Sequence, residues 1–252
     1  GVPSHYNNLI KKSAFREFKL PKLRYVTQAG GAMAVAMIKE FREMLPDVKF
    51  YVMYGQTEAA ARLSYLDPRY LPEKIGSIGK AIPKVELDVL GENNLPVSVG
   101  ETGEIVARGE NIMLGYWNAP EETARVLREQ WLLTGDLARK DEDGFIYMVS
   151  RKKEMIKSGA NRISPLEIED VVCQMAAVVE CAAVGMPDEI LGEAIRLYVV
   201  LNGVKVTERE IMIYCRNNLA GYKQPKEIRF VDGLPKTSTG KICRLSLSGM
   251  NN

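Results

Sequence analysis

The order of apolar and polar residues in the first 75 positions predicts two strands with a helix between them. Residues 22–27 and 49–54 are rich in the β-branched and aromatic residues that strands favour. The segment between them carries apolar residues at helical spacing and is ended by Pro46; those apolar residues are Met33, Met37, Ile38 and Phe41. A strand, a helix and a second strand predict a βαβ unit of a parallel sheet covered by helices.

Residues 76–150 have a different pattern, with short apolar stretches separated by turns. Strands are expected at residues 85–90, 104–108, 137–140 and 145–149. Asp143 and Gly144 form a two-residue hairpin signal between the last two strands. A single longer helix, at residues 120–127, interrupts the stretch. We therefore expect a small antiparallel barrel or meander here.

The last hundred residues begin with the cationic run Arg151–Lys153 and a glycine-containing loop that extends to Arg162. Two helix starts follow, because Ser164 and Thr207 each precede a glutamate by three positions, the spacing of a capping box. Strands are expected at residues 178–184, 195–201 and 227–231, before a polar loop at residues 235–241. This pattern predicts a compact α/β domain of roughly a hundred residues.

Composition narrows the classes of function. The 252-residue chain has 34 Lys and Arg against 32 Asp and Glu, a net charge of +2, and 26% of its residues are charged. These values are ordinary for a globular protein and do not fit a disordered chain or a polybasic nucleic-acid binder. His5 is the single histidine, so most zinc sites and most catalytic triads that need an imidazole are excluded.

The four cysteines contain no Cys-x-x-Cys pair, so neither a disulfide framework nor a metal knuckle is expected. Reduced thiols fit a cytoplasmic protein. The most apolar run, residues 29–37, is shorter than the ~18 residues of a membrane span, and the chain opens without a signal segment. Because the first residue is Gly1 and not Met, we expect this sequence to be part of a longer polypeptide.

The segment Tyr54-Gly55-Gln56-Thr57-Glu58 lies where a predicted strand ends in a turn, the place where open α/β sheets bind ligands. Its aromatic face, flexible glycine, hydroxyl and carboxylate suit base stacking, a phosphate contact and Mg²⁺ ligation. The alternative is an ordinary strand-to-helix turn, with Thr57 as the cap and Glu58 in the first helical turn. Local sequence supports the two interpretations equally.

Three further stretches offer chemistry for a nucleotide. Asp136 follows a glycine turn, where a carboxylate can accept from ribose hydroxyls or bond to its own backbone. The run 151–159 carries cations that suit phosphate groups or a solvated face. Lys241 ends a hydroxyl-rich loop, from which a mobile ammonium can reach a phosphate; a solvated surface turn is the commoner use of such a sequence.

The order and spacing of these stretches resemble the C-terminal half of the adenylate-forming superfamily, which includes acyl-CoA synthetases, firefly-type luciferases and peptide-synthetase adenylation domains. The matching stretches run in family order over nearly the whole chain, at residues 30–33, 54–58, 103–105, 115–117, 134–136, 151–153, 157–159, 163–169 and 235–241. The resemblance implies the remnant of a large domain, with its α/β part at 1–75 and a barrel-like subdomain at 76–150. A small, mobile α/β domain at 151–252 would follow.

Enzymes of this superfamily condense a carboxylic acid with Mg·ATP, release pyrophosphate, and pass the acyl group from an acyl-adenylate to a thiol. The resemblance implies that Gly31, Ala32 and Met33 line the pocket between the adenosine and the acyl chain. Tyr54 would lie on the adenine, beside Gly55 and Gln56. Thr57 would contact the phosphates, and Glu58 would ligate Mg²⁺.

The resemblance also gives roles to residues nearer the C-terminus. Asp136 would accept from the ribose hydroxyls, and Arg151 would lie beside ribose and phosphate. Lys241 would neutralise charge on the transferring phosphate. Lys153 occupies the hinge position, about which the small domain would rotate to withdraw Lys241 and bring in the loop of Lys157 and Gly159. A glycine there would let the pantetheine arm of coenzyme A pass.

Two residues point to one branch of the superfamily. A lysine at the hinge position, Lys153, and a proline at residue 165 resemble the pattern of the CoA ligases and luciferases. The implied partners are a carboxylic acid, leaning towards an aliphatic one, with ATP, Mg²⁺ and coenzyme A. The phosphate loop of the N-terminal half is absent, so we expect these 252 residues alone to be inactive. The alternatives are an acyl-AMP ligase that loads a separate carrier protein and a non-catalytic nucleotide-binding module.

Overall fold

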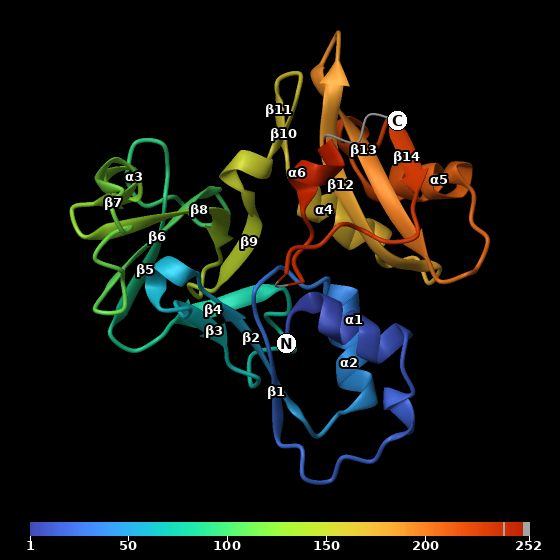
Figure 1. The fold of residues 1–252 in the computed structure, drawn as a ribbon, viewed down its shortest axis with the longest axis horizontal. Helices are drawn as coiled ribbons and strands as arrows, with labels where there is room; N and C mark the ends of the chain where they lie inside the picture. The colour runs from blue at the N-terminus through green and yellow to red at the C-terminus, as the bar shows by residue number, and fades with distance from the viewer. Residues whose placement is uncertain (239, 249–252) are drawn as a thin grey trace. The chain divides into compact units, whose positions relative to one another are not determined.

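The computed structural model describes residues 1–238 and 240–248, and the chain divides into two compact units. The first unit contains Gly1, residues 20–32 and residues 45–153. The second contains residues 2–19, residues 33–44 and the chain from Glu154 onward. Figure 1 colours the chain from its first residue to its last. None of the helices in the described ranges has the length and apolar character that a bilayer crossing needs.

The first unit is built on a nine-stranded sheet whose order is β1-β2-β3-β4-β9-β8-β6-β5, with β7 beside β8. Its strands are β1 (Tyr25–Gln28), β2 (Lys49–Tyr54), β3 (Ser64–Leu66), β4 (Ser77–Ala81), β5 (Val85–Leu90), β6 (Gly103–Gly109), β7 (Leu127–Arg128), β8 (Trp131–Lys140) and β9 (Ile146–Arg151). Helix α3 (Pro120–Val126) follows β6 along the chain. Strands β1 and β2 pair in parallel with Tyr25 opposite Lys49, which confirms the βαβ expectation.

The antiparallel strands expected between residues 76 and 150 continue this same sheet, because β4 pairs with both β3 and β9. Strands β8 and β9 form the hairpin expected at Asp143–Gly144. The inward residues of the strands in this part of the sheet form a core together with side chains from the loops. This core includes Leu63, Val89, Ile105, Leu132 and Ile146. The apolar pattern therefore located β5, β6 and β9, but it gave no signal for β3 and β4 and missed the first part of β8, Trp131 to Asp136.

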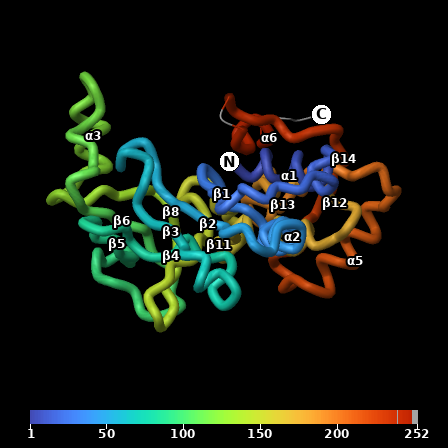
Figure 2. Tube along the Cα trace, turned by 90° about the horizontal axis from the view of Figure 1, so that it is seen from below, coloured from blue at the N-terminus to red at the C-terminus, as the bar shows by residue number. Residues whose placement is uncertain are grey.

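The second unit includes two helices from the N-terminal part of the chain, α1 (Pro3–Lys11) and α2 (Val35–Met44). They lie side by side (Figure 2), with the rings of Tyr6 and Phe41 packed edge to face at 4.9 Å between centroids. Lys11 and Arg16 both pair with Glu40 at the surface of this helix pair. Helix α2 ends before Pro46, as expected.

The rest of the second unit is an α/β fold around a five-stranded sheet of order β11-β10-β13-β12, with β14 parallel to β13. Its strands are β10 (Ile156–Ser158), β11 (Asn161–Ile163), β12 (Val178–Asp188), β13 (Gly192–Leu201) and β14 (Glu227–Phe230). Its helices are α4 (Pro165–Val172), α5 (Glu208–Asn218) and α6 (Arg244–Ser248). The expectation of a loop up to Arg162 was wrong, because β10 and β11 form a hairpin there.

Alternating side chains of β12 and β13 enter two different cores, as the two-residue period of a strand requires. One core joins Ala183, Ile195 and Leu197 to residues of α4 and α5. The other joins Ala182, Val184 and Tyr198 to the C-terminal segment through Leu234 and Leu247. The sheet is thus covered on both faces, which is why its central strands read as continuous apolar runs.

The two capping boxes differ. Thr207 forms the full box, since its hydroxyl accepts from the backbone of Glu210 and the Glu210 carboxylate accepts from the backbone N–H of Thr207. At α4 the Ser164 hydroxyl accepts from Glu167 N, but the Glu167 carboxylate binds Lys223 Nζ at 2.5 Å instead. The Ser164 box is therefore only half formed.

Candidate nucleotide site

Three of the predicted site residues meet in one buried cluster of the first unit. Tyr54, the last residue of β2, donates its hydroxyl to Asp136 Oδ2 at 2.7 Å. Arg151, the last residue of β9, lies with Nε 2.9 Å from Asp136 Oδ1. Burial, together with the nearby Asp136 carboxylate, raises the pKa of Tyr54 above its usual value, so its hydroxyl remains a donor.

Strand β8 holds Asp136 through its own backbone and through β6. Thr134 Oγ1 donates to Ile105 O at 2.7 Å and accepts from Asp136 N at 3.2 Å. Gly135 has a φ of +73°, a conformation that glycine adopts without strain. Its N–H donates to Glu104 Oε1 at 3.0 Å. Thr134, Gly135 and Asp136 thus lie within β8 and not in a turn, at a point where its pairing with β6 is irregular, and these bonds join them to β6.

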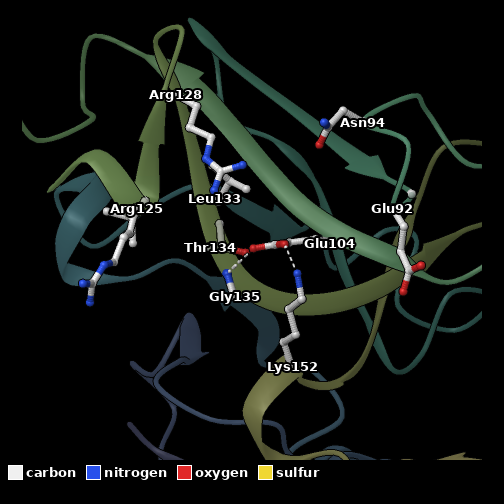
Figure 3. Close-up of a pocket in the computed structure, with 11 residues that line it drawn as sticks. Glu92, Asn94, Glu104, Arg125, Arg128, Leu133, Thr134, Gly135 and Lys152 are labelled. Atoms are coloured by element: carbon white, nitrogen blue, oxygen red, sulfur yellow. Dashed lines mark hydrogen bonds and ion pairs between the residues drawn. The ribbon is translucent and has the colours of Figure 1, made fainter. Parts of the chain in front are cut away.

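A salt bridge extends this framework to the residue after Arg151. Lys152 Nζ lies 3.0 Å from Glu104 Oε2, so one carboxylate binds both Gly135 and Lys152, as Figure 3 shows. Leu133 and Gly135, which alternate with Thr134 and Asp136 along β8, line a cavity of about 500 Å³ at this point. Glu104 therefore connects the backbone of β8 to Lys152, which lies next to the last residue of the first unit.

The cluster is closed in this structure. The Asp136 side chain is 4% exposed, and Arg151 and Tyr54 each bond to one of its oxygens. The Tyr54 side chain is also buried, among Ala59, Leu63 and Ile78. Arg151 is the exposed member of the cluster, with 42% of its side chain accessible to solvent. A ribose hydroxyl can approach the Asp136 carboxylate if Arg151 turns aside.

The turn after Tyr54 is tight and requires glycine. A Cβ atom on Gly55 would lie 2.5 Å from Ala61 O and 2.8 Å from Arg62 Cα, closer than any side chain tolerates. The turn then continues as a short 3-10 helix, Thr57–Ala59, that starts after Gln56. Gln56 occupies the capping position, and no side chain caps this helix. The alternative role of Thr57 as a helix cap is therefore wrong, and its side chain is exposed.

Glu58 is held by a residue to which the sequence assigned no role. Tyr116 OH donates to Glu58 Oε1 at 2.7 Å, and this bond raises the pKa of Tyr116 to about 12. The backbone also connects the two segments, because Met113 N donates to Glu58 O at 2.8 Å. Thr123 fixes Tyr116 in turn, since its hydroxyl accepts from Tyr116 N at 2.9 Å. The loop between β6 and α3 therefore orients the Glu58 carboxylate.

The site fits Mg²⁺ of the kind that is bound together with a nucleotide. In the described part of the chain no group of three or more His, Cys, Asp or Glu side chains is placed to hold a metal. Mg²⁺ often binds to one or two carboxylates and completes its shell with phosphate oxygens and water. Glu58 is half-buried and accepts from Tyr116 through Oε1, so Oε2 is the oxygen that could serve as such a carboxylate ligand.

The remaining predicted residues lie elsewhere in the two units. Gly31 and Ala32 are exposed in the first unit, where Gly31 O accepts from Gln28 Nε2 at 2.6 Å. Met33 is 7% exposed and belongs to the second unit, consistent with a core position. The described contacts place none of these three residues in the Tyr54 cluster.

Lys157, Gly159 and Lys241 also belong to the second unit. Gly159 lies at the tip of the β10–β11 hairpin with a φ of +57°, and its N–H donates to Leu191 O at 2.7 Å. Lys157 is exposed beside it, and its N–H donates to Glu193 Oε2 at 2.6 Å. The Lys241 side chain is exposed, at the end of the loop that precedes α6. Positive φ is thus a second reason for glycine at residue 159.

Sequence reasoning missed Tyr116, Glu104 and Lys152. The stretch of Gly115, Tyr116 and Trp117 did match the resemblance, so Tyr116 could have been singled out as a conspicuous hydroxyl. Its contact with Glu58 joins residues 58 positions apart, and a local pattern carries no information about such a pair. The same is true of the Glu104–Lys152 bridge.

Comparisons with known proteins show which family the chain belongs to. Residues 1–117 match the family model described as AMP-binding enzyme, and residues 167–241 match that of the AMP-binding enzyme C-terminal domain. A long-chain-fatty-acid–CoA ligase of Yersinia pestis is 38% identical over 247 residues, which are 98% of this chain and 44% of that relative. A feruloyl-CoA synthase of Amycolatopsis sp is 38% identical, over 97% of this chain and 50% of the relative.

Solved structures give the same result. An anthranilate CoA ligase in complex with anthranoyl-AMP superposes with a TM-score of 0.91 and 31% identity, over 98% of this chain and 48% of that one. An o-succinylbenzoate coenzyme A synthetase from Bacillus subtilis, in complex with ATP and magnesium ion, has a TM-score of 0.85 and 30% identity, with coverage of 98% and 50%. The chain spans about half the length of the relatives it matches. The chain belongs to the AMP-binding enzyme family, and its resemblance to the adenylate-forming ligases is confirmed.

Proposed function

We propose that the complete polypeptide carrying this sequence is an AMP-forming carboxylic acid–CoA ligase, with an aliphatic or fatty acid as substrate. The observation that carries the proposal is the joining of Tyr54 and Arg151, the last residues of β2 and β9, to Asp136 in the middle of β8, with Glu58 close in sequence to Tyr54. The relatives that are named as CoA ligases support the reaction class. The long-chain-fatty-acid–CoA ligases among them support the choice of acid.

In the first half-reaction a carboxylate oxygen of the acid attacks the α-phosphorus of ATP, and the bond to pyrophosphate breaks. Asp136 binds the ribose hydroxyls after Arg151 turns from the carboxylate towards ribose and phosphate. Tyr54, Gly55 and Gln56 form the adenine side of the pocket, and Gly31, Ala32 and Met33 form the wall towards the acyl chain. The Tyr54 hydroxyl keeps Asp136 oriented, because its donation survives at neutral pH.

Three residues bind or stabilise the phosphate groups. Thr57 contributes a hydroxyl from the exposed turn, and Glu58 holds Mg²⁺, which supplies charge neutralisation at the phosphate oxygens when bound. Lys241 provides a mobile ammonium to the reacting phosphate, where such electrostatic stabilisation accelerates transfer. In the second half-reaction the thiol sulfur of coenzyme A attacks the acyl carbon, and AMP leaves.

One pivot would serve both steps. We place it at residues 151–153, where the chain passes from the first compact unit to the second for the last time, between Lys153 and Glu154. Rotation there withdraws Lys241 and brings Lys157 and Gly159, at the exposed tip of the β10–β11 hairpin, to the pantetheine arm. ATP, Mg²⁺ and coenzyme A are all available in the cytoplasm, where we place the protein.

The test is acid-dependent exchange of pyrophosphate into ATP by the complete polypeptide, measured over a panel of carboxylic acids. We expect exchange with aliphatic acids, a loss of about 10²–10³-fold for Lys241→Ala, and a comparable loss for Asp136→Asn. The 252-residue chain alone should give no exchange. Absence of exchange with every acid would support a non-catalytic nucleotide-binding module and overturn the proposal.

The acceptor is tested separately, by offering coenzyme A or a phosphopantetheinylated carrier protein to the loaded enzyme. Formation of acyl-CoA is the expected result. Transfer to the carrier alone would identify an acyl-AMP ligase and contradict the CoA assignment while leaving the adenylation step intact.

A further inference from the structure

A largely buried arginine lies three positions after Lys241. Arg244 is the first residue of α6, and its side chain is 16% exposed. Its Nη2 donates to both oxygens of Glu169, at 2.9 and 2.7 Å. Its Nη1 donates to Glu154 Oε2 at 3.2 Å. One guanidinium therefore joins three segments that are far apart in the sequence.

Glu169 is the rigid partner of this cluster. It lies in α4, and its Oε1 also accepts from Ala183 N in β12 at 2.9 Å. Burial raises the pKa of the Glu169 carboxyl, and Arg244 opposes that rise. A buried carboxylate without its cation is strongly destabilising, so this pair holds α6 beside α4 and β12 (Figure 1).

Glu154 is the other partner of Arg244. Its position directly after the proposed pivot is the reason why we assign a function to the cluster. It is the first residue of this stretch of the second unit, directly after Lys153. Its carboxylate is 30% exposed, less buried than that of Glu169. Arg244 thus connects the start of the unit, at the proposed pivot, to the segment that carries Lys241.

The described residues of the loop that carries Lys241 are held by bonds within the loop and by contacts with the rest of the second unit. Thr237 N donates to Lys241 O at 2.8 Å, and Lys241 N donates to Thr237 Oγ1 at 3.2 Å. Cys243 N donates to Pro235 O at 2.8 Å, which closes the base of the loop. These bonds give the loop its own shape. The Lys236–Glu180 ion pair, the packing of Leu234 and Ile242 on the sheet, and the close approach of Gly240 to Ser4 attach it to the rest of the unit, and Arg244 adds the charged contact that reaches Glu154.

We propose that Arg244 is a positioning residue for Lys241. Its bonds to Glu154 and Glu169 fix the direction in which the segment that carries Lys241 extends from the pivot. The inference rests on the proposed function, because it takes Lys241 as the residue that acts in adenylation. It goes beyond that function by predicting that the cluster serves only one of the two half-reactions. Thioester formation, for which Lys241 is withdrawn, does not depend on it.

The experiment measures both half-reactions in the complete polypeptide. Pyrophosphate exchange reports adenylation, and the conversion of supplied acyl-adenylate and coenzyme A to acyl-CoA reports thioester formation. We expect Arg244→Gln to lower exchange at least tenfold and thioester formation less than threefold. Arg244→Lys should recover part of the exchange, since it restores a cation without the two-branched contact.

One further variant and two controls keep the test independent of folding. Glu154→Ala removes the partly exposed partner alone and should lower exchange several-fold with the thermal midpoint nearly unchanged. Arg196→Gln and Glu227→Ala are the matched controls, because Arg196 is also buried and pairs with Glu227 at 2.7 Å, remote in the sequence from Lys241. These controls should affect both half-reactions to the same degree.

Each outcome is decisive. Equal losses in both half-reactions for Arg244→Gln and Glu154→Ala would show a merely structural role and overturn the inference, as would unchanged exchange in both variants. Lys241→Ala separates this failure from failure of the proposed function. If Lys241→Ala leaves exchange intact, the function assigned to the lysine is wrong; if it abolishes exchange while Glu154→Ala and Arg244→Gln do not, only the positioning role is wrong.

Discussion

Removing one oxygen atom from Tyr116 should weaken the proposed magnesium site without disturbing the fold. In Tyr116→Phe the Glu58 carboxylate loses the hydroxyl that donates to it at 2.7 Å. A hydrogen bond to a charged group contributes about 1.5–3 kcal/mol, so we expect the Mg²⁺ concentration for half-maximal exchange to rise by about tenfold. The effect should be constant between pH 6 and 9, because the pKa of Tyr116 is raised to about 12.

Tyr147→Phe is the matched control for this measurement. Tyr147 also donates to a carboxylate of the first unit, Asp141 Oδ2 at 3.3 Å, but it has no contact with Glu58. Its removal should leave the magnesium requirement unchanged. If both variants shift the requirement equally, Tyr116 has no specific role in orienting Glu58.

The four thiols should differ in their reaction with iodoacetamide. Ser246 donates to Cys243 Sγ at 3.2 Å and lowers the pKa of that thiol, whereas burial raises the pKa of Cys215 to about 11. A lower pKa gives more thiolate at neutral pH, so Cys243 should be alkylated before Cys215 and Cys181. Peptide mass mapping over time checks the order, and Ser246→Ala should shift the pH midpoint of Cys243 alkylation upwards. Faster labelling of Cys215 in the folded chain would contradict this assignment.

At the candidate site, the residues could be predicted from the sequence, whereas most of the contacts between them could not. Tyr54 was identified from a turn that follows a strand and Asp136 from an expected glycine turn; the structure joins them although they are 82 positions apart, and it places Asp136 within β8. The closure of the cluster by Arg151 and the support from Glu104 depend on how β6, β8 and β9 align. Such alignment is set by the sheet as a whole, and no window of the sequence contains it.

A methyl group added to the glycine of the turn after β2 should distort this turn and destabilise the protein. Gly55→Ala places a carbon 2.5 Å from a backbone oxygen that cannot move aside, so the loop up to Arg62 must shift. We expect a loss of roughly 1–3 kcal/mol in the free energy of unfolding. Gly233→Ala is the control, since nothing lies within 4 Å of its added carbon, and it should be nearly neutral. Urea denaturation measures both, and equal stabilities would refute the close approach.

Elements with strong local signals were predicted well. The helix α5 begins at the capping box of Thr207, and β2 and β5 have the bounds that their apolar patterns gave. The hairpin of β10 and β11 was missed because each strand has only three residues and a polar middle residue, Lys157 or Arg162. Elements this short are formed by tertiary contacts and leave almost no periodicity to detect.

Residues 154–252 should fold without the rest of the chain. Every buried member of the two cores on either face of its sheet comes from this segment, from Ile156 to Leu247. We expect a single cooperative urea transition and dispersed amide resonances for the isolated segment. Its stability should be below that of the whole second unit, because α1 and α2 are missing. A non-cooperative transition would show that those helices are indispensable.

Strand β1 stands at one end of the nine-stranded order, so one row of its main-chain groups faces away from β2. Gly1 covers part of that row, since its N donates to Thr27 O and its O accepts from Ala29 N. The uncovered part begins at Tyr25, just after the exposed cations Lys22 and Arg24. Open edges of this kind recruit further strands and seed aggregates, and flanking charges oppose it. Added salt, by screening that repulsion, is therefore expected to promote self-association of the chain during purification.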